Sequence, residues 1–118
     1  SDDWDDADLG DLVELANDRF SLKAQEIGLT SQTRLIVQSD RRAFLFQAGV
    51  KPKEVPVNHD LSAPFLRLTV DHNLLHRLLR GPRFAHWNNA EIGSHIHWER
   101  QPDVFERGLQ HCLYFLHS

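Results

Sequence analysis

The pattern of hydrophobic and polar positions predicts strands in the first half of the chain. Residues 34–38 and 43–47 are short apolar runs rich in β-branched and aromatic side chains, and the polar segment 39–42 between them suits a hairpin. Both runs are apolar at consecutive positions, so we expect both sides of the hairpin to be covered. Residues 65–70 alternate and predict a third strand, and 54–57 predict a further short one.

Apolar residues at helical spacing predict four helical segments. The first two cover residues 7–19 and 21–27, and the third covers 71–80 behind an aspartate that can cap it. The last predicted helix, 103–117, has the widest apolar face. Gly108 lies within that face, which indicates a close backbone approach there.

The least generic stretch is residues 86–103, between the last two predicted helices. From Ile92 to Trp98 every second side chain falls on one face, and this period of two predicts a half-buried strand. The opposite face carries His95, His97 and Glu99. A proline near the end of the stretch is expected to stop the strand and begin the last helix.

These elements predict an α+β fold: a mostly antiparallel sheet of about five strands with helices packed on it. We expect residues 1–118 to form a single domain. The 118 residues are 41% hydrophobic and 25% charged, which is average for a globular domain. The chain contains no methionine, which indicates a domain cut from a longer protein.

Charge and composition exclude several classes of partner. The net charge of -4 gives no electrostatic footprint for nucleic acid. No apolar run approaches the roughly 18 residues that a membrane span needs. The single cysteine, Cys112, excludes an internal disulfide and predicts a cytoplasmic location. It falls on the apolar face of the last helix, where a thiol is usually inert.

His95, His97 and Glu99 are the sharpest candidates for metal chemistry. On one face of a strand their spacing can hold zinc with an open position, as in a small metal-dependent enzyme. The run also echoes the His-x-His-x-Asp-His signature of metallo-β-lactamase-fold hydrolases, but Glu99 replaces the aspartate and Arg100 the final histidine. The alternative is the polar outer face of a sheet, which we favour.

Two other groups offer possible cation ligands. His72 and His76 have the spacing of a two-histidine metal pair on a helix, but no glutamate follows His72 as a metalloprotease motif requires. We predict that they lie at the rim of a buried face. Six aspartates between residues 2 and 11 surround Trp4, and we interpret them as a solvated helix start rather than a cation site.

The sequence shows no motif for nucleophilic or phosphate chemistry. It has no glycine-rich phosphate loop and no serine in a Gly-x-Ser-x-Gly context. The polar corner 86–89 could face a ligand, but we favour a turn with Trp87 in the core. We therefore predict no catalytic residue, no metal and no cofactor.

The order of elements resembles a sterol carrier protein type two-like domain. The resemblance is carried by the helix, hairpin and third strand, then the leucine-rich helix that ends at Arg80-Gly81, and a strand and final helix over 91–116. It implies an α+β domain that often encloses an apolar tunnel for lipids or acyl chains. The residues that we would place near such a cavity are Leu35, Val37, Phe44, Phe46, Leu75, Leu79, Trp98, Phe105, Leu109 and Phe115.

The amino-acid sequence of residues 86–109, together with Phe115-Leu116-His117, also resembles the C-terminal end of bacterial metallo-β-lactamase-superfamily proteins. This implies that the metal-binding half lies upstream, and that the domain is a non-catalytic accessory that binds an apolar ligand or the apolar part of a substrate. The alternative is a structural module that packs on the parent enzyme or forms a homodimer. A filled core is the commoner use of such side chains.

Overall fold

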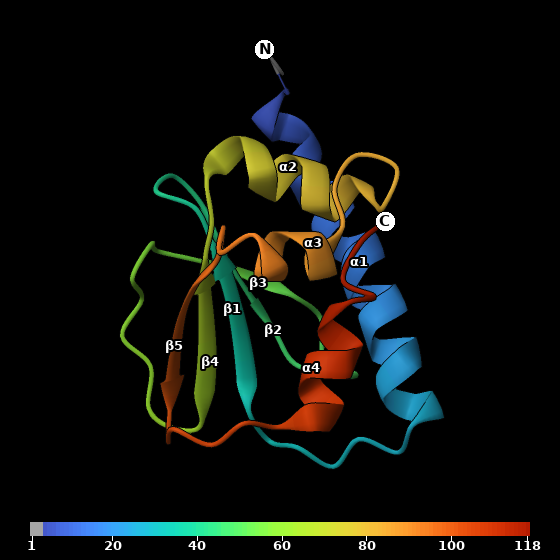
Figure 1. Cartoon of the computed structure of the whole chain (residues 1–118), viewed down its shortest axis with the longest axis vertical. Coiled ribbons are helices and arrows are strands. Elements are labelled where there is room, and N and C mark those ends of the chain that lie inside the picture. Colours follow the sequence, from blue (N-terminus) through green and yellow to red (C-terminus); the bar gives the residue numbers. More distant parts are fainter. Residues whose placement is uncertain (1–3) are drawn as a thin grey trace.

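A five-stranded mixed sheet forms the centre of the structure, a computed structural model that describes residues 4–118 (Figure 1). The strands are β1 (Arg34–Gln38), β2 (Ala43–Phe46), β3 (Lys53–Val55), β4 (Phe65–Thr69) and β5 (His97–Gln101). They lie in the order β3-β2-β1-β4-β5, and β1 and β4 are the parallel pair. The predicted α+β class is confirmed, with a sheet that is mostly antiparallel but mixed.

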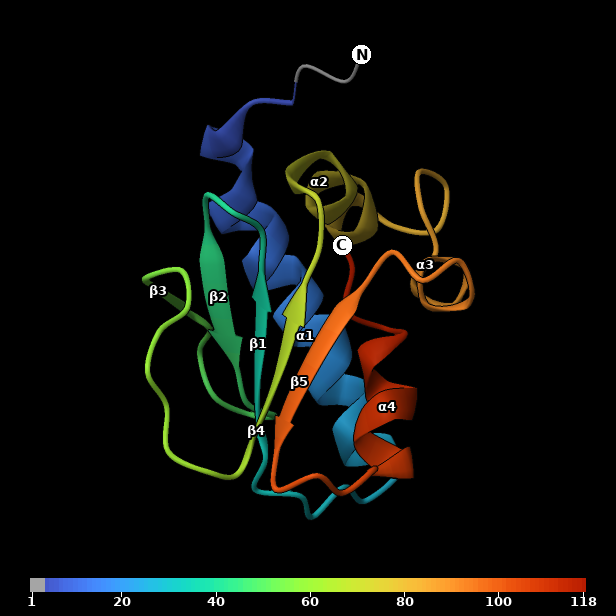
Figure 2. The same cartoon turned by 60° about the vertical axis from the view of Figure 1, so that its left-hand side comes forward.

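Helices cover one face and one end of this sheet. A 3-10 turn, η1 (Asp6–Asp8), leads into α1 (Leu9–Glu26), which lies beside α4 (Arg107–Leu113) on one face of the sheet (Figure 2). Helix α2 (His72–Arg80) follows β4 almost directly and so lies across the end of the sheet. The short helix α3 (Trp87–Ile92) comes next along the chain. Within residues 4–118 no helix is both long and apolar enough to cross a membrane.

The main core lies between the sheet and the helices. Alternate residues of β1, β2 and β4 point into it and meet the apolar faces of α1, α2 and α4. A smaller cluster on the opposite face contains Ile36, Ala43 and Val55, with Val57 and Leu61 from the loop after β3 packed against it. The expected covering of both sides of the hairpin is confirmed, and a loop supplies the second cover.

The predicted helix boundaries were wrong in two places. Helix α1 is continuous where two pieces were expected, because the Ser21 hydroxyl accepts a hydrogen bond from the Gly49 N–H (3.1 Å) instead of capping a new helix. The last helix covers Arg107–Leu113 instead of 103–117, so it begins later and ends earlier than predicted, and Pro102 follows the strand without beginning the helix. A Cβ on Gly108 would lie 3.0 Å from Leu29, which confirms the close approach expected at this glycine.

The strand predicted over 92–98 was also placed too early. Residues 87–92 form α3, because Trp87 and Ala90 both turn into the core one helical turn apart. Ser94, with φ 59°, lies in the turn that follows, and β5 starts only at His97. Trp87 occupies the core as predicted, in a short helix rather than a turn.

Candidate functional site

Most of the residues expected to line a ligand cavity are packed in the main core. Seven of them are at most 3% exposed: Leu35, Val37, Phe44, Phe46, Leu75, Leu79 and Leu109. Trp98 is half-buried against this core, and Phe115 is half-buried beneath the Lys23 ammonium. Phe105 is 59% exposed. The structure thus brings seven of the ten together as core and leaves Phe105 at the surface.

An apolar cleft of about 220 Å³ lies where β4 and β5 meet the start of α4. Its apolar walls include Phe65 and Leu66 of β4, Leu109 of α4, and Val104 from the segment between β5 and α4. Of the ten predicted residues, Leu109 lines this cleft. The other residues that line the cleft could not be predicted from the sequence, because the cleft forms between strand ends and a non-helical segment, where no periodicity marks a surface.

Polar side chains around this cleft differ in how they are held. Glu106 accepts hydrogen bonds from the hydroxyls of Ser31 (2.5 Å) and Thr33, so both of its carboxylate oxygens are engaged. Arg100 lies over the rings of Trp98 (5.8 Å to the centroid) and Phe105 (5.5 Å). No carboxylate within residues 4–118 forms an ion pair with Arg100. Arg100 is therefore the cation at this cleft that remains available to a ligand.

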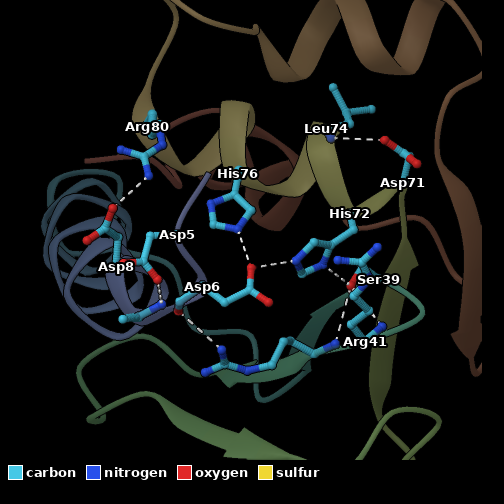
Figure 3. Close-up of polar contacts among 12 residues, drawn as sticks. Asp5, Asp6, Asp8, Ser39, Arg41, Asp71, His72, Leu74, His76 and Arg80 are labelled. Carbon is cyan, nitrogen blue, oxygen red and sulfur yellow. Dashed lines mark hydrogen bonds and ion pairs between the residues drawn. The ribbon is translucent and has the colours of Figure 1, made fainter. Parts of the chain in front are cut away.

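A second site joins η1 to α2 (Figure 3). The Oδ1 atom of Asp6 lies 2.7 Å from Nε2 of His72 and 2.8 Å from Nε2 of His76. The two histidines are one helical turn apart on α2, so their rings share a face, and the ring centroids are 5.1 Å apart. Both imidazoles are buried, whereas the Asp6 side chain is 41% exposed. We call these three residues the Asp6 cluster.

Local capping fixes both elements of the Asp6 cluster. The Asp5 carboxylate accepts a hydrogen bond from the Ala7 N–H (2.9 Å) and begins η1. The Asp71 carboxylate accepts one from the Leu74 N–H (3.3 Å) and begins α2, as the sequence predicted. Asp8 forms an ion pair with Arg80 (3.1 Å) and ties the two elements together beside the cluster. The prediction that the aspartates form only a solvated helix start was wrong for Asp6 and Asp8, because each has a partner on α2. Asp2 and Asp3 lie outside the described residues.

Ser39 sets the tautomer of His72. The Ser39 hydroxyl oxygen accepts hydrogen bonds from the backbone N–H groups of Arg41 (3.1 Å) and Arg42 (3.2 Å), so its own proton is donated to His72 Nδ1 (2.7 Å). His72 therefore carries its proton on Nε2 and donates it to Asp6. His76 Nε2 donates to the same oxygen, which leaves its buried Nδ1 without a partner within the described chain.

These hydrogen bonds favour the ionised form of Asp6. The bond from His76 is the largest cause and the bond from His72 the next, and together they lower the pKa of the Asp6 carboxyl from 3.8 to about 2. The Trp4 ring stacks on His76, and the Arg80 guanidinium lies over Trp4 (4.1 Å). The cluster is thus an anion held by two buried imidazoles and partly shielded by an indole.

A serine, a histidine and an aspartate in hydrogen-bonded order are also the parts of a hydrolase triad. Here the order of ring nitrogens is reversed, because Nδ1 contacts Ser39 and Nε2 contacts Asp6. Ser39 is fully buried, and its oxygen already accepts two backbone hydrogen bonds. A substrate carbonyl has no access to this hydroxyl, so the arrangement does not support acyl transfer.

The histidines and the glutamate predicted as possible metal ligands lie in different surroundings. His72 and His76 are buried in the cluster, so their predicted place at a rim was wrong. His95 is exposed and precedes β5, and Glu99 forms an ion pair with Arg67 (3.0 Å). In the part of the chain that the structure describes, the Asp6 cluster is the one group of three or more such side chains close enough to share a metal ion.

Cys112 is fully buried, and burial raises the pKa of its thiol, which agrees with the inert role expected.

Comparisons of the chain with protein-family models, curated proteins and solved structures found no match.

Proposed function

We propose that this chain is a non-catalytic accessory domain with a sterol carrier-like fold, and that it binds the apolar part of a lipid or other substrate. The observation that carries the proposal is the apolar cleft between β4, β5 and α4. The apolar side chain of Val104 lines the cleft and is 60% exposed, so the apolar surface continues outside it. The order of elements and the resemblance of residues 86–109 and 115–117 support the same role.

The volume of the cleft limits the size of the ligand that it can hold. Pockets for drug-sized ligands have volumes of roughly 300–1,000 Å³, and this cleft has about 220 Å³. It accommodates one end of an acyl chain or a small ring, while the rest of the ligand would lie on Val104 and Phe105. Arg100 at the wall would pair with a carboxylate or phosphate, so the ligand class is an anionic amphiphile.

Binding of this kind would position a substrate without catalysing its reaction. The domain would hold a substrate by its apolar end while a separate catalytic domain acts on the other end. On the resemblance of its C-terminal part, we propose that the catalytic partner is an upstream metallo-β-lactamase-fold domain. The hydroxyl and the carboxylate at the cleft, those of Thr33 and Glu106, are hydrogen-bonded to each other, which suits a binding role.

Displacement of a fluorescent fatty-acyl probe by unlabelled fatty acids tests the proposal. We expect saturable binding of one probe per chain, weakened about tenfold (~1.4 kcal/mol) by Val104→Asp and by Arg100→Gln. The matched controls are Ile92→Asp, at a residue 74% exposed and outside the cleft, and Arg83→Gln, an exposed arginine. Absence of saturable binding, or equal loss in the controls, would exclude the cleft as the ligand site.

The edge strand β5 favours a second candidate function, a homodimerisation module. Strand β5 has β4 as its one neighbour in the sheet, so its outer backbone groups can pair with a second copy. Val104 and Phe105 follow this edge directly and are exposed. Light scattering after size-exclusion chromatography distinguishes the functions: a dimer that Phe105→Ser dissociates supports this role, and a monomer that binds the acyl probe supports the first.

A further inference from the structure

We propose that Asp6, His72 and His76 bind a divalent transition-metal ion, for which Zn²⁺ is the best match, with water at the fourth position. Two imidazole nitrogens and one carboxylate are a common catalytic-type ligand set for zinc, which accepts three protein ligands and one exchangeable site. The site shares no residue with the apolar cleft. The proposal is therefore independent of the proposed function.

The ligand atoms already converge. The candidate donor atoms of the three side chains all lie within 4.8 Å of one another. Zinc bonds of about 2.0–2.1 Å at tetrahedral angles place ligand atoms roughly 3.3 Å apart, and the present N···O distances are 2.7 and 2.8 Å. An outward movement of the Asp6 carboxylate by about half an ångström creates the required space. Asp6 can make it because its side chain is partly exposed and lies on a short 3-10 turn.

Neighbouring groups orient the two histidines as metal-site neighbours do. Protein metal sites commonly fix each histidine through its second ring nitrogen. In the metal-free cluster Ser39 donates to His72 Nδ1, and two backbone N–H groups in turn hold Ser39. An ion at Nε2 would shift the ring proton to Nδ1, which would then donate to the Ser39 oxygen and keep the ring in place. Helix α2 and the stacked Trp4 ring fix His76. The rings are thus held in place before any ion arrives.

Hydrogen bonding alone leaves this cluster incomplete. His76 is 1% exposed, and its Nδ1 has no partner within residues 4–118. A metal bond at Nε2 would give this buried ring a stronger interaction than its present single hydrogen bond. Arg42, which donates to the Asp6 carbonyl, and Arg80, which lies over Trp4, do not oppose a cation fully, because Glu54 pairs with Arg42 and Asp8 with Arg80.

Metal-stripped protein titrated with Zn²⁺ by calorimetry tests the site. We expect one ion per chain and a rise in melting temperature with metal, with affinity at least tenfold lower in Asp6→Asn and in His72→Gln. Asp6→Asn is the main variant, because a partly exposed residue on η1 can change without loss of the core. Circular dichroism checks that it folds.

Two matched controls separate this site from nonspecific binding. His95→Gln/His97→Gln removes two exposed histidines elsewhere, and Asp11→Asn removes an equal charge from an exposed position outside the cluster. Both should keep the affinity. With Co²⁺ in place of Zn²⁺, tetrahedral d–d absorption should appear in wild-type protein and be absent in Asp6→Asn. No stoichiometric binding, or binding that the His95/His97 change abolishes and Asp6→Asn does not, would overturn the proposal.

Discussion

At the scale of the residue, one carboxylate oxygen of Asp6 accepts hydrogen bonds from two imidazoles. Such an oxygen stabilises its ionised form and loses that stabilisation when protonated. The Ser39 hydroxyl donates its proton to His72 Nδ1, because its oxygen already accepts two backbone hydrogen bonds. The cluster therefore has a defined arrangement of protons without any metal.

Acid titration of chelator-treated protein tests this arrangement. The folded-state pKa of Asp6 is about 2, below its ordinary value of 3.8, so the unfolded chain binds more protons between these values. The stabilisation is complete above pH 3.8 and lost as pH falls towards 2. The two values differ by nearly two pKa units, but the side chain is 41% exposed, so we expect only about 1 kcal/mol after allowing for solvent screening. Denaturant midpoints should converge for wild type and Asp6→Asn over this window, and parallel curves would contradict the assignment.

At the scale of the element, α3 is held by the rest of the molecule rather than by its own length. A helix of six residues is unstable in isolation, since nucleation costs more than so few hydrogen bonds return. Trp87 and Ala90 bury its inner face, and the Trp87 indole Nε1 donates a hydrogen bond to the Leu116 carbonyl (2.8 Å). This bond connects α3 to the end of the chain.

Trp87→Phe should remove that connection. The Leu116 carbonyl would be buried without its donor, at a cost of about 1–3 kcal/mol, in addition to the space left by the smaller ring. Urea denaturation measures the loss. Trp98→Phe is the matched control, because Trp98 is half-buried on an edge strand and should cost less. Equal losses in the two variants would show that the indole hydrogen bond does not stabilise α3.

At the scale of the whole molecule, the sheet has two unequal covers. Helices α1 and α4 close one face over the main core, and a loop closes part of the other over Ile36. The main core is bounded by packed elements, whereas the loop can move inward. A cavity therefore collapses more readily under the loop, and collapse reduces the cost of a truncated side chain.

Leu68→Ala and Ile36→Ala compare the two covers. Both side chains are fully buried in central strands, Leu68 under the helices and Ile36 under the loop. We expect losses of about 4 kcal/mol for Leu68→Ala and about 2–3 kcal/mol for Ile36→Ala, within the range for such truncations. Ile92→Ala at the surface should change stability by less than about 0.5 kcal/mol. Equal losses at the two buried positions would mean that the loop is as rigid as the helices.

Elements whose form depends on residues close to them along the chain could be predicted from the amino-acid sequence. The runs in β1, β2 and β4, the leucine stripe of α2 and the core position of Trp87 follow from local periodicity and capping. Periodicity gave a wrong prediction where the same local pattern fits both a strand and a helix. The alternation around Ile96 fits a strand, but the burial of Trp87 and Ala90 together makes the preceding residues a helix.

Contacts between residues far apart in the sequence became visible in the three-dimensional fold alone. Asp6 lies 66 residues from His72 and 70 from His76, and no local pattern encodes that contact. The parallel pairing of β1 with β4, which places α2 at the end of the sheet, brings them together. The cleft beside Val104 likewise forms where strand ends meet a helix start. Side-chain pattern shows which face is buried, but the path of the chain fixes what lies against it.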